Sequence, residues 1–231
     1  MPRGLATLCL CLAASAPLAG GCRSGAATGL GGGPVVRQER ISGEANALGK
    51  VAVIPFYPAE TLEAAPAQGG GGEPVPKARW EIAALVSNQV SEALVTEGVP
   101  VVAPSDVELA FVGEGHPVPR LDPLAAARLA GGSFGATSVL LGKVVRYRER
   151  EGGAAGSIRP ASVAFEVSLH HVPSGRRLWT GRFDETQQSL TANVFRARQY
   201  PGGGTRWLSA SEFAHWGAAE VVRSLVAEQR S

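Results

Sequence analysis

The sequence predicts an α/β (mixed α+β) domain, in which a mixed sheet of about five strands carries helices packed on it and a helix ends the chain. Three observations support this prediction. Short apolar runs alternate with segments of period 3.6 in the first half of the chain, two strands of period two joined by a turn follow, and a capped amphipathic segment comes last. Strands that alternate with helices and then form a hairpin are typical of a mixed sheet covered by helices.

The first half opens on the apolar run 51–56, Val-Ala-Val-Ile-Pro-Phe, which is rich in β-branched residues and predicts a buried strand. Residues 57–78 are rich in proline and glycine and predict a loop. We expect a helix over 80–97, because its side chains repeat with a helical period and Gly98 is a typical helix stop. The residues on that period are Ile82, Leu85, Val86, Gln89, Val90, Ala93 and Leu94.

Two helix starts follow the second short strand, which we expect over 99–103. The segment 105–108, Ser-Asp-Val-Glu, has the spacing of a capping box. Farther along, Asp122 is a typical N-cap residue, and Pro123 stands where a proline is favoured, at the first helical position. A long strand is then expected over 137–148.

The second half contains the hairpin and the last helix. Residues 162–170 alternate apolar and polar side chains, as a half-buried strand does. Residues 173–175, Pro-Ser-Gly, predict a turn, after which 176–183 returns as the antiparallel strand. The segment 209–212, Ser-Ala-Ser-Glu, is a second capping box and predicts the start of the C-terminal helix.

Residues 1–21 have the parts of a secretory signal: a positive charge at Arg3, an apolar run over 5–18, and small residues before Cys22. This pattern predicts a bacterial lipoprotein whose signal peptide is removed and whose Cys22 carries acyl chains such as palmitate. The apolar run is shorter than the roughly 20 residues that span a bilayer. Two alternatives stay open, an uncleaved anchor and cleavage without lipidation, because Ala19 stands where a lipoprotein signal usually has leucine.

The chain is therefore expected to have three parts: a signal peptide over 1–21, a lipidated Cys22 with a flexible tether over 22–46, and a single periplasmic α/β domain over 47–231. Glycines and the lack of a hydrophobic period predict the tether. The other two cysteines lie in the signal, so the mature chain would keep one cysteine. An internal disulfide and a cluster of thiolate ligands are thereby excluded.

The charge balance excludes a large class of partners. The net charge of the whole chain is +2, and without the one charge of Arg3 in the signal it is +1. A nucleic-acid-binding domain carries concentrated positive charge on one face. We therefore expect no nucleic-acid partner.

Three patterns suggest ligand or catalytic chemistry, and each lacks the full spacing. The glycines of 69–72 lack the Lys-Ser/Thr order of a phosphate loop. Consecutive strand residues point to opposite faces, so His170 and His171 are unsuited to one metal ion. Asp184 and Glu185 follow a strand and should also splay apart. We expect no metal, no cofactor and no catalytic residue, and a hydrolase that uses Asp184 or Glu185 stays as the enzymatic alternative.

Residues 195–207 interleave arginine and aromatic side chains without an acid. Both side-chain types are enriched at protein interfaces. The residues that we predict to bind a partner are Arg196, Arg198, Tyr200 and Arg206. The alternative is a glycine-rich loop in which Phe195 and Trp207 are core anchors and the arginines are merely exposed.

Several segments stand in a familiar order: the strand ending in Pro55-Phe56, the helix from Trp80, the run 101–107, and 125–142 with its Gly-Ala pair. This order resembles the α/β domain of periplasmic lipoproteins, which include the curli-secretion lipoprotein, the penicillin-binding-protein activator lipoprotein and the TolB amino-terminal domain. The part after residue 160 is similar to uncharacterised lipoproteins of deltaproteobacteria. The resemblance implies a βαβ-type core in a non-enzymatic envelope protein.

We therefore expect an outer-membrane-anchored periplasmic lipoprotein that acts as a non-enzymatic adaptor or regulator and binds another cell-envelope protein. Arg23 follows Cys22 where retention in the inner membrane commonly requires aspartate, which favours the periplasmic face of the outer membrane. The alternative is an oligomeric secretion-channel component similar to the curli-secretion lipoprotein. In that case 57–78 or 149–161 would have to form membrane hairpins.

Overall fold

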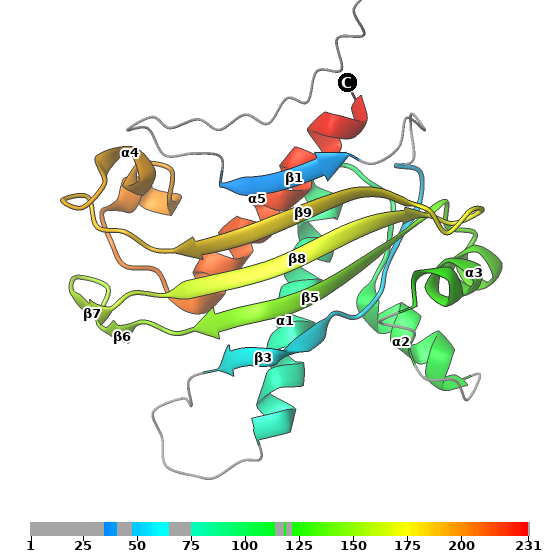
Figure 1. The fold of residues 1–231 in the computed structure, drawn as a ribbon, viewed down its shortest axis with the longest axis horizontal. Helices are drawn as coiled ribbons and strands as arrows, with labels where there is room; N and C mark the ends of the chain where they lie inside the picture. Colours follow the sequence, from blue (N-terminus) through cyan, green and yellow to red (C-terminus); the bar gives the residue numbers. More distant parts are fainter. Residues whose placement is uncertain (1–34, 41–47, 65–74, 114–117, 119–121, 231) are drawn as a thin grey trace, which may run out of the picture. The chain divides into compact units, whose positions relative to one another are not determined.

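The computed structural model describes residues 35–40, 48–64, 75–113, 118 and 122–230. The predicted signal, Cys22 and the glycine run at 69–72 lie outside these residues. The described part of the chain forms one mixed sheet with helices on both of its faces (Figure 1).

The sheet has seven strands in the order β1-β9-β8-β5-β2-β4, and β3 pairs with the far half of β5. β2 pairs in parallel with β4 and β5, β3 pairs in parallel with β5, and β5, β8, β9 and β1 are antiparallel neighbours. The strands are β1 (Val36–Arg40), β2 (Val51–Val53), β3 (Tyr57–Ala64), β4 (Val101–Val102), β5 (Ser138–Arg148), β8 (Ser162–His171) and β9 (Arg177–Thr186). A separate two-stranded hairpin joins β6 (Glu151–Gly152) to β7 (Ser157–Arg159).

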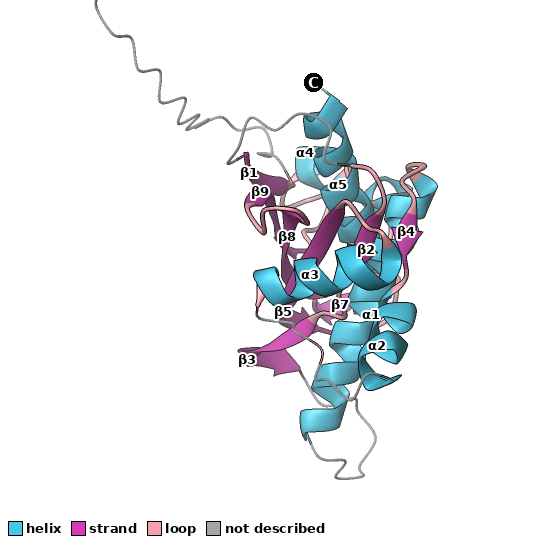
Figure 2. Ribbon diagram, turned by 90° about the vertical axis from the view of Figure 1, so that its right-hand side faces the viewer, coloured by secondary structure: helices cyan, strands magenta, loops and turns pink. Residues whose placement is uncertain are grey.

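Two long helices, α1 (Val75–Thr96) and α5 (Ala210–Arg230), cover one face of the sheet (Figure 2). α2 (Pro104–Gly113) and α3 (Pro123–Phe134) cover part of the opposite face. Between β9 and α5 the chain forms the short α4 (Val194–Ala197) and a 3-10 turn, η1 (Pro201–Gly204).

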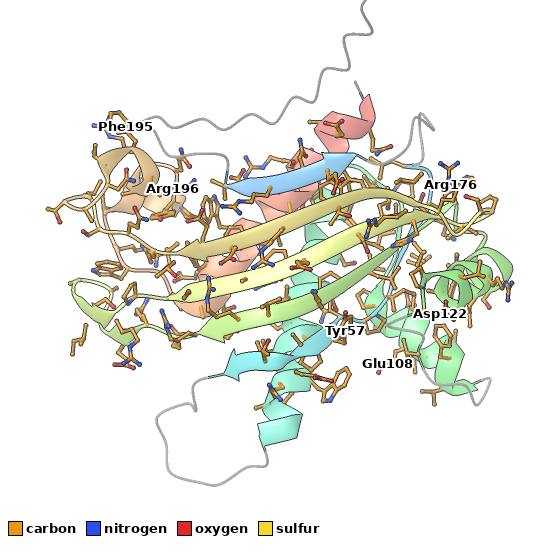
Figure 3. The ribbon with its side chains drawn as sticks, in the orientation of Figure 1. Tyr57, Glu108, Asp122, Arg176, Phe195 and Arg196 are labelled. Carbon is orange, nitrogen blue, oxygen red and sulfur yellow. The ribbon has the colours of Figure 1, made fainter. Side chains whose placement is uncertain are left out.

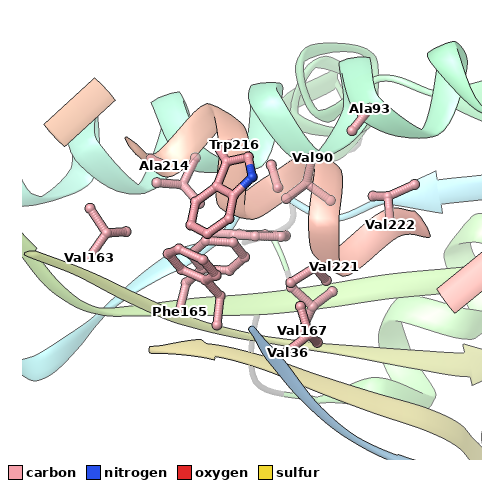
Figure 4. Close-up of a cluster of buried hydrophobic side chains, with 14 of the residues drawn as sticks. Val36, Val90, Ala93, Val163, Phe165, Val167, Ala214, Trp216, Val221 and Val222 are labelled. Atoms are coloured by element: carbon pink, nitrogen blue, oxygen red, sulfur yellow. The ribbon is translucent and has the colours of Figure 1, made fainter. Parts of the chain in front are cut away.

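The larger core lies between the sheet and the α1–α5 pair (Figure 4). The alternation predicted for β8 explains it, because Val163, Phe165, Val167 and Leu169 all point into this core. Phe183 on β9 stacks on Phe165 with ring centroids 5.4 Å apart. Burying such side chains yields roughly 1.5–3 kcal/mol each, so this face supplies most of the stability.

The smaller core lies on the other face, where α2 and α3 pack on β2, β4 and the first residues of β5. Ala52 and Ile54 point to it, whereas Val51 and Val53 point to the larger core, as alternation along a buried strand requires. The middle of β8 and β9 carries no helix on this side in the part of the chain that the structure describes (Figure 1). We call this uncovered area the open sheet face.

The mixed α/β fold with a C-terminal helix is confirmed, and the sheet has more strands than the expected five or so. The sequence predicts a tether for residues 36–40, but they form β1, whose Val36 is buried against the core. Residues 57–64 were expected in a loop, but they form β3, which continues beside β5 after β2 has ended. Both strands are at edges of the sheet, where few side chains are buried and the apolar signal is weak.

The helix ends agree with the predicted caps in two of three cases. The Asp122 carboxylate accepts from the amides of Leu124 and Ala125 at the start of α3. Ser209 and Glu212 form a reciprocal capping box, with bonds of 2.9 and 3.2 Å. The expected cap at Ser105 is wrong, because α2 begins one residue earlier, at Pro104, whose ring favours the first helical turn.

Candidate functional site

The chain between β9 and α5, residues 187–207, contains all four predicted contact residues, and we call it the α4 segment. Gln187 fixes both of its ends. The buried side chain of Gln187 donates to the carbonyl of Arg206 at 2.8 Å and accepts from the amide of Leu208 at 2.8 Å. Its first and last residues are therefore held together at the end of the sheet.

Arg196 is held inside the α4 segment by an ion pair with Glu185 on β9. Its guanidinium lies 2.6 Å from the carboxylate, and the two side chains are only 12% and 9% exposed. Burial raises the pKa of Glu185, and the charge of Arg196 opposes that rise. Asn193 caps α4 by accepting from the Arg196 amide at 3.0 Å. Arg196 thus anchors the segment to the sheet.

Tyr200 is a core residue in the structure. Its ring makes edge contacts with Phe213 and Trp216 on α5, at centroid distances of 5.6 and 5.3 Å. The phenol oxygen accepts from the amide of Gln188 at 3.2 Å, and burial raises the pKa of Tyr200 to about 12. Tyr200 therefore fastens the middle of the α4 segment to the helix layer.

Arg206 lies on the surface and pairs with the capping box of α5. Its guanidinium donates two bonds, of 3.0 and 2.8 Å, to the carboxylate of Glu212. The bonds from Arg206, together with the Ser209 amide, lower the pKa of Glu212 to about 2. Arg206 therefore links the end of the α4 segment to the first turn of α5.

The outer side of the α4 segment exposes apolar side chains and one arginine. Phe195 is 61% exposed, Val194 is 40% exposed and Leu190 is 38% exposed. Arg198 is exposed beside them. Figure 3 shows Phe195 at the tip, pointing away from the sheet, with Arg196 below it.

The structure therefore separates the four predicted contact residues by position. Arg198 is exposed, Arg206 is exposed and paired, and Arg196 and Tyr200 are turned inward. Phe195, which the scaffold alternative treated as a core anchor, is the most exposed aromatic residue of the segment. The exposure of Phe195 could have been predicted only with the knowledge that Tyr200, and not Phe195, is the aromatic residue buried in the core.

The open sheet face carries a row of charges in which each group is paired with one of opposite sign. Lys143 on β5 lies 2.8 Å from Glu166 on β8, which also pairs with Arg182 on β9. Arg182 lies 2.6 Å from Asp184, and Asp184 lies 2.5 Å from Arg146 on β5. These five alternating charges cross three strands, and we call them the charge ladder. Both Arg146 and Arg182 bond Asp184 and lower its pKa against the effect of burial.

The two carboxylates and the two histidines considered as candidate sites are each separated, because consecutive strand residues point to opposite faces. Asp184 belongs to the charge ladder on the open sheet face, whereas Glu185 points to the opposite face and to Arg196. His170 contacts Ser168, and His171 contacts Ser174 in the hairpin turn. Among the described residues, no three histidine, cysteine or acidic side chains are grouped as metal ligands would be.

The described parts of the two segments considered for membrane hairpins form other elements. Residues 57–64 are β3, paired within the main sheet, and 151–159 form the short β6–β7 hairpin. The Trp207 amide donates to the carbonyl of Ala154, in the turn of that hairpin, at 2.9 Å. No helix in the described ranges combines the length and the apolarity that crossing a membrane requires.

No protein-family model and no curated protein matches this chain. Among solved structures it is similar to the PelC dodecamer from Paraburkholderia phytofirmans, with 18% identity over 82% of this chain and 95% of that chain and a TM-score of 0.45. It is similar to lipoprotein GNA1162 from Neisseria meningitidis, with 17% identity over 60% of this chain and 83% of that chain and a TM-score of 0.39. It is also similar to the LpoB C-terminal domain from Escherichia coli, with 15% identity over 61% of this chain and 84% of that chain and a TM-score of 0.34. One of these similar structures is thus a lipoprotein, the class that the sequence resembles.

Proposed function

We propose that this protein is a cell-envelope lipoprotein, held by Cys22 at the periplasmic face of the outer membrane, and that its α4 segment binds another envelope protein without catalysing a reaction. One observation carries the proposal: the α4 segment exposes Phe195, Val194 and Leu190 although its base is fixed in the core.

A fixed base matters because binding costs less when the contact surface is already ordered. Arg196 and Tyr200 hold the α4 segment to β9 and α5, and Gln187 joins its ends. The exposed tip then presents an aromatic ring beside Arg198. Aromatic and arginine side chains are enriched among the residues that dominate binding energy at interfaces.

The partner site is tested by removing the exposed tip and keeping the base. The double variant Phe195→Ala with Arg198→Ala should reduce recovery of the crosslinked partner from intact cells about tenfold or more, because it removes two interface anchors. Arg223→Gln, an exposed arginine on α5, is the matched control. Equal recovery by the double variant and the wild-type protein would refute the assignment.

The anchor is tested separately. Cys22→Ser should release the protein from the membrane fraction into the soluble periplasm, because acyl chains supply stable attachment. A variant that still sediments with membranes, or a mature N-terminus without acyl chains by mass spectrometry, would show that this part of the proposal is wrong.

The non-enzymatic part rests on where the acids lie. Asp184 is held in the charge ladder, and Glu185 is buried against Arg196 on the other face. The two carboxylates therefore lack a shared space in which a substrate could contact both. A hydrolase activity on envelope polymers that disappears in the Asp184→Asn protein would overturn this statement.

A further inference from the structure

A pocket of about 270 Å³ lies at one end of the open sheet face, next to α3. Its floor is formed by Ser168 and Thr180, which are opposite each other on β8 and β9. Tyr57 on β3 forms part of its wall, and Figure 3 shows this residue on the same side of the sheet. The space is close to the lower size limit of small-molecule sites.

Two cationic side chains line the pocket from opposite ends. Lys143 belongs to the charge ladder, and Arg177 stands at the start of β9. The acid that lines it, Glu166, has one oxygen on Lys143 and the other on Arg182. Because Glu166 is shared by two cations, the pocket keeps an excess of positive charge.

The histidine beside the pocket adds no charge at neutral pH. Burial lowers the pKa of His170, so the ring is neutral. Its Nδ1 lies 3.3 Å from the carbonyl of Gly175, which only accepts, so Nδ1 carries the proton. Nε2 then accepts from the Ser168 hydroxyl at 3.1 Å. The proton of Ser168 is thereby used within the protein.

Two side chains of the pocket keep hydrogen-bonding capacity that no described group of the protein uses. The Thr180 hydroxyl is buried and has no hydrogen-bond partner. No hydrogen bond or ion pair joins the exposed Arg177 side chain to any group that the structure describes. Buried polar atoms without partners are rare in folded proteins, and each one calls for an explanation such as a functional role or a bound water or ion.

The contrast with the charge ladder is informative. Along the ladder, each of the five charged groups has a partner of opposite sign. Only a few residues away, Arg177 and Thr180 leave donors unused. Glu39 on β1 is opposite Thr180 in the sheet, but it does not line the pocket. Of the buried side-chain atoms without a partner in the described part of the chain, the Thr180 hydroxyl is the one whose residue lines the pocket.

From this we propose that the pocket binds a hydroxylated ligand of about the size of one sugar ring that carries a single oxyanion, a carboxylate or a phosphate. Arg177 holds the oxyanion, and Thr180 donates to a ligand oxygen. Lys143 and Tyr57 line the other end of the pocket. This site is independent of the partner surface on the α4 segment, and it adds a second binding activity to the protein.

The test is a binding titration of the full-length protein in detergent with sodium D-glucuronate, D-glucose 6-phosphate and D-glucose, followed by nuclear magnetic resonance. We expect one or both anionic sugars to bind, glucose to bind about tenfold more weakly, and added salt to weaken the anionic sugars. Glucuronate alone would assign a carboxylate, and glucose 6-phosphate alone would assign a phosphate.

Two variants connect the binding to this pocket. Arg177→Gln should weaken the anionic sugar about tenfold, and Thr180→Val should weaken it a few-fold while leaving stability unchanged, since the Thr180 hydroxyl has no partner to lose. Arg223→Gln, on the far side of the sheet, should bind as the wild-type protein does. The proposal is overturned if none of the three sugars binds, if glucose binds equally well, or if Arg177→Gln leaves the affinity unchanged. Such a failure would not affect the partner surface.

Discussion

The open sheet face and the α4 segment are both exposed, yet they treat their side chains in opposite ways. On the open sheet face, the charge ladder pairs Lys143, Glu166, Arg182, Asp184 and Arg146 with one another. On the α4 segment, the charged Arg196 is turned inward against Glu185 and the apolar Phe195 is exposed. A surface whose charges are already satisfied needs no partner protein, whereas an ordered apolar tip gains free energy when one covers it.

The largest expected effect is at the base of the α4 segment. Arg196→Ala leaves Glu185 buried without its counter-charge and should lower the free energy of unfolding by about 3–5 kcal/mol in urea titrations at pH 7. Burial already raises the pKa of Glu185, and losing Arg196 raises it further. A carboxyl whose pKa is higher in the folded protein than in the unfolded chain stabilises the fold at a pH below the pKa of the unfolded chain, and this stability is lost as the pH rises. The stability that Arg196→Ala loses relative to the wild type should therefore shrink near pH 4. A loss below about 1 kcal/mol would contradict the anchoring role.

Gly204 tests the shape of the same segment. Its φ is +75°, and a Cβ added there would lie 2.5 Å from the carbonyl oxygen of Ala197. Gly204→Ala should therefore cost about 2–3 kcal/mol and reduce partner recovery as well. Gly203→Ala is the matched control, because its φ is +66° but nothing lies within 4 Å of the added Cβ. Equal losses for the two variants would show that backbone conformation alone, and not the contact with Ala197, decides the effect.

The joint between the α4 segment and α5 should have a smaller effect. Ser209→Ala removes one bond of the capping box and should cost about 1 kcal/mol in thermal unfolding at pH 7. The pKa of Glu212 is lowered to about 2, so its contribution is present above its ordinary pKa, near 4.5, and is lost as the pH falls toward 2. The Glu212→Gln protein should therefore lose less stability than the wild type over that range. Parallel curves would contradict the capping box.

The smallest effect is expected on the open sheet face. Arg182→Ala removes two partly exposed ion pairs and should cost less than about 1 kcal/mol, with a difference that fades in high salt. Partner recovery should stay unchanged. A strong loss of partner recovery in this variant would move the partner surface from the α4 segment to the sheet.

Much of the fold could be predicted because the relevant signals are local. The alternation of 162–170, the helical period of 80–97 and the capping box at 209–212 each correspond to an element that the structure contains. β1 was missed because its sequence, Val-Arg-Gln-Glu-Arg, buries only one apolar side chain. β3 was missed because its partner, the far half of β5, is distant in the sequence.

The candidate site could be located but not resolved into roles. Arginine and aromatic residues at 195–207 marked the segment, whereas the burial of Arg196 depends on Glu185, which belongs to the preceding strand. Tyr200 is buried because α5 supplies Phe213 and Trp216, and no local pattern states that contact. The pocket at Arg177 and Thr180 was missed for the same reason, since four strands and a helix build it.

The most direct test of the partner surface compares crosslinking from the two exposed surfaces of the protein in living cells. A photo-reactive amino acid is placed at Phe195 in one protein and at Arg182 in another, and adducts are identified by mass spectrometry. We expect position 195 to form an adduct with a specific envelope protein and position 182 to form none with it. An adduct with that protein from position 182 alone, or no adduct from position 195, would contradict this expectation.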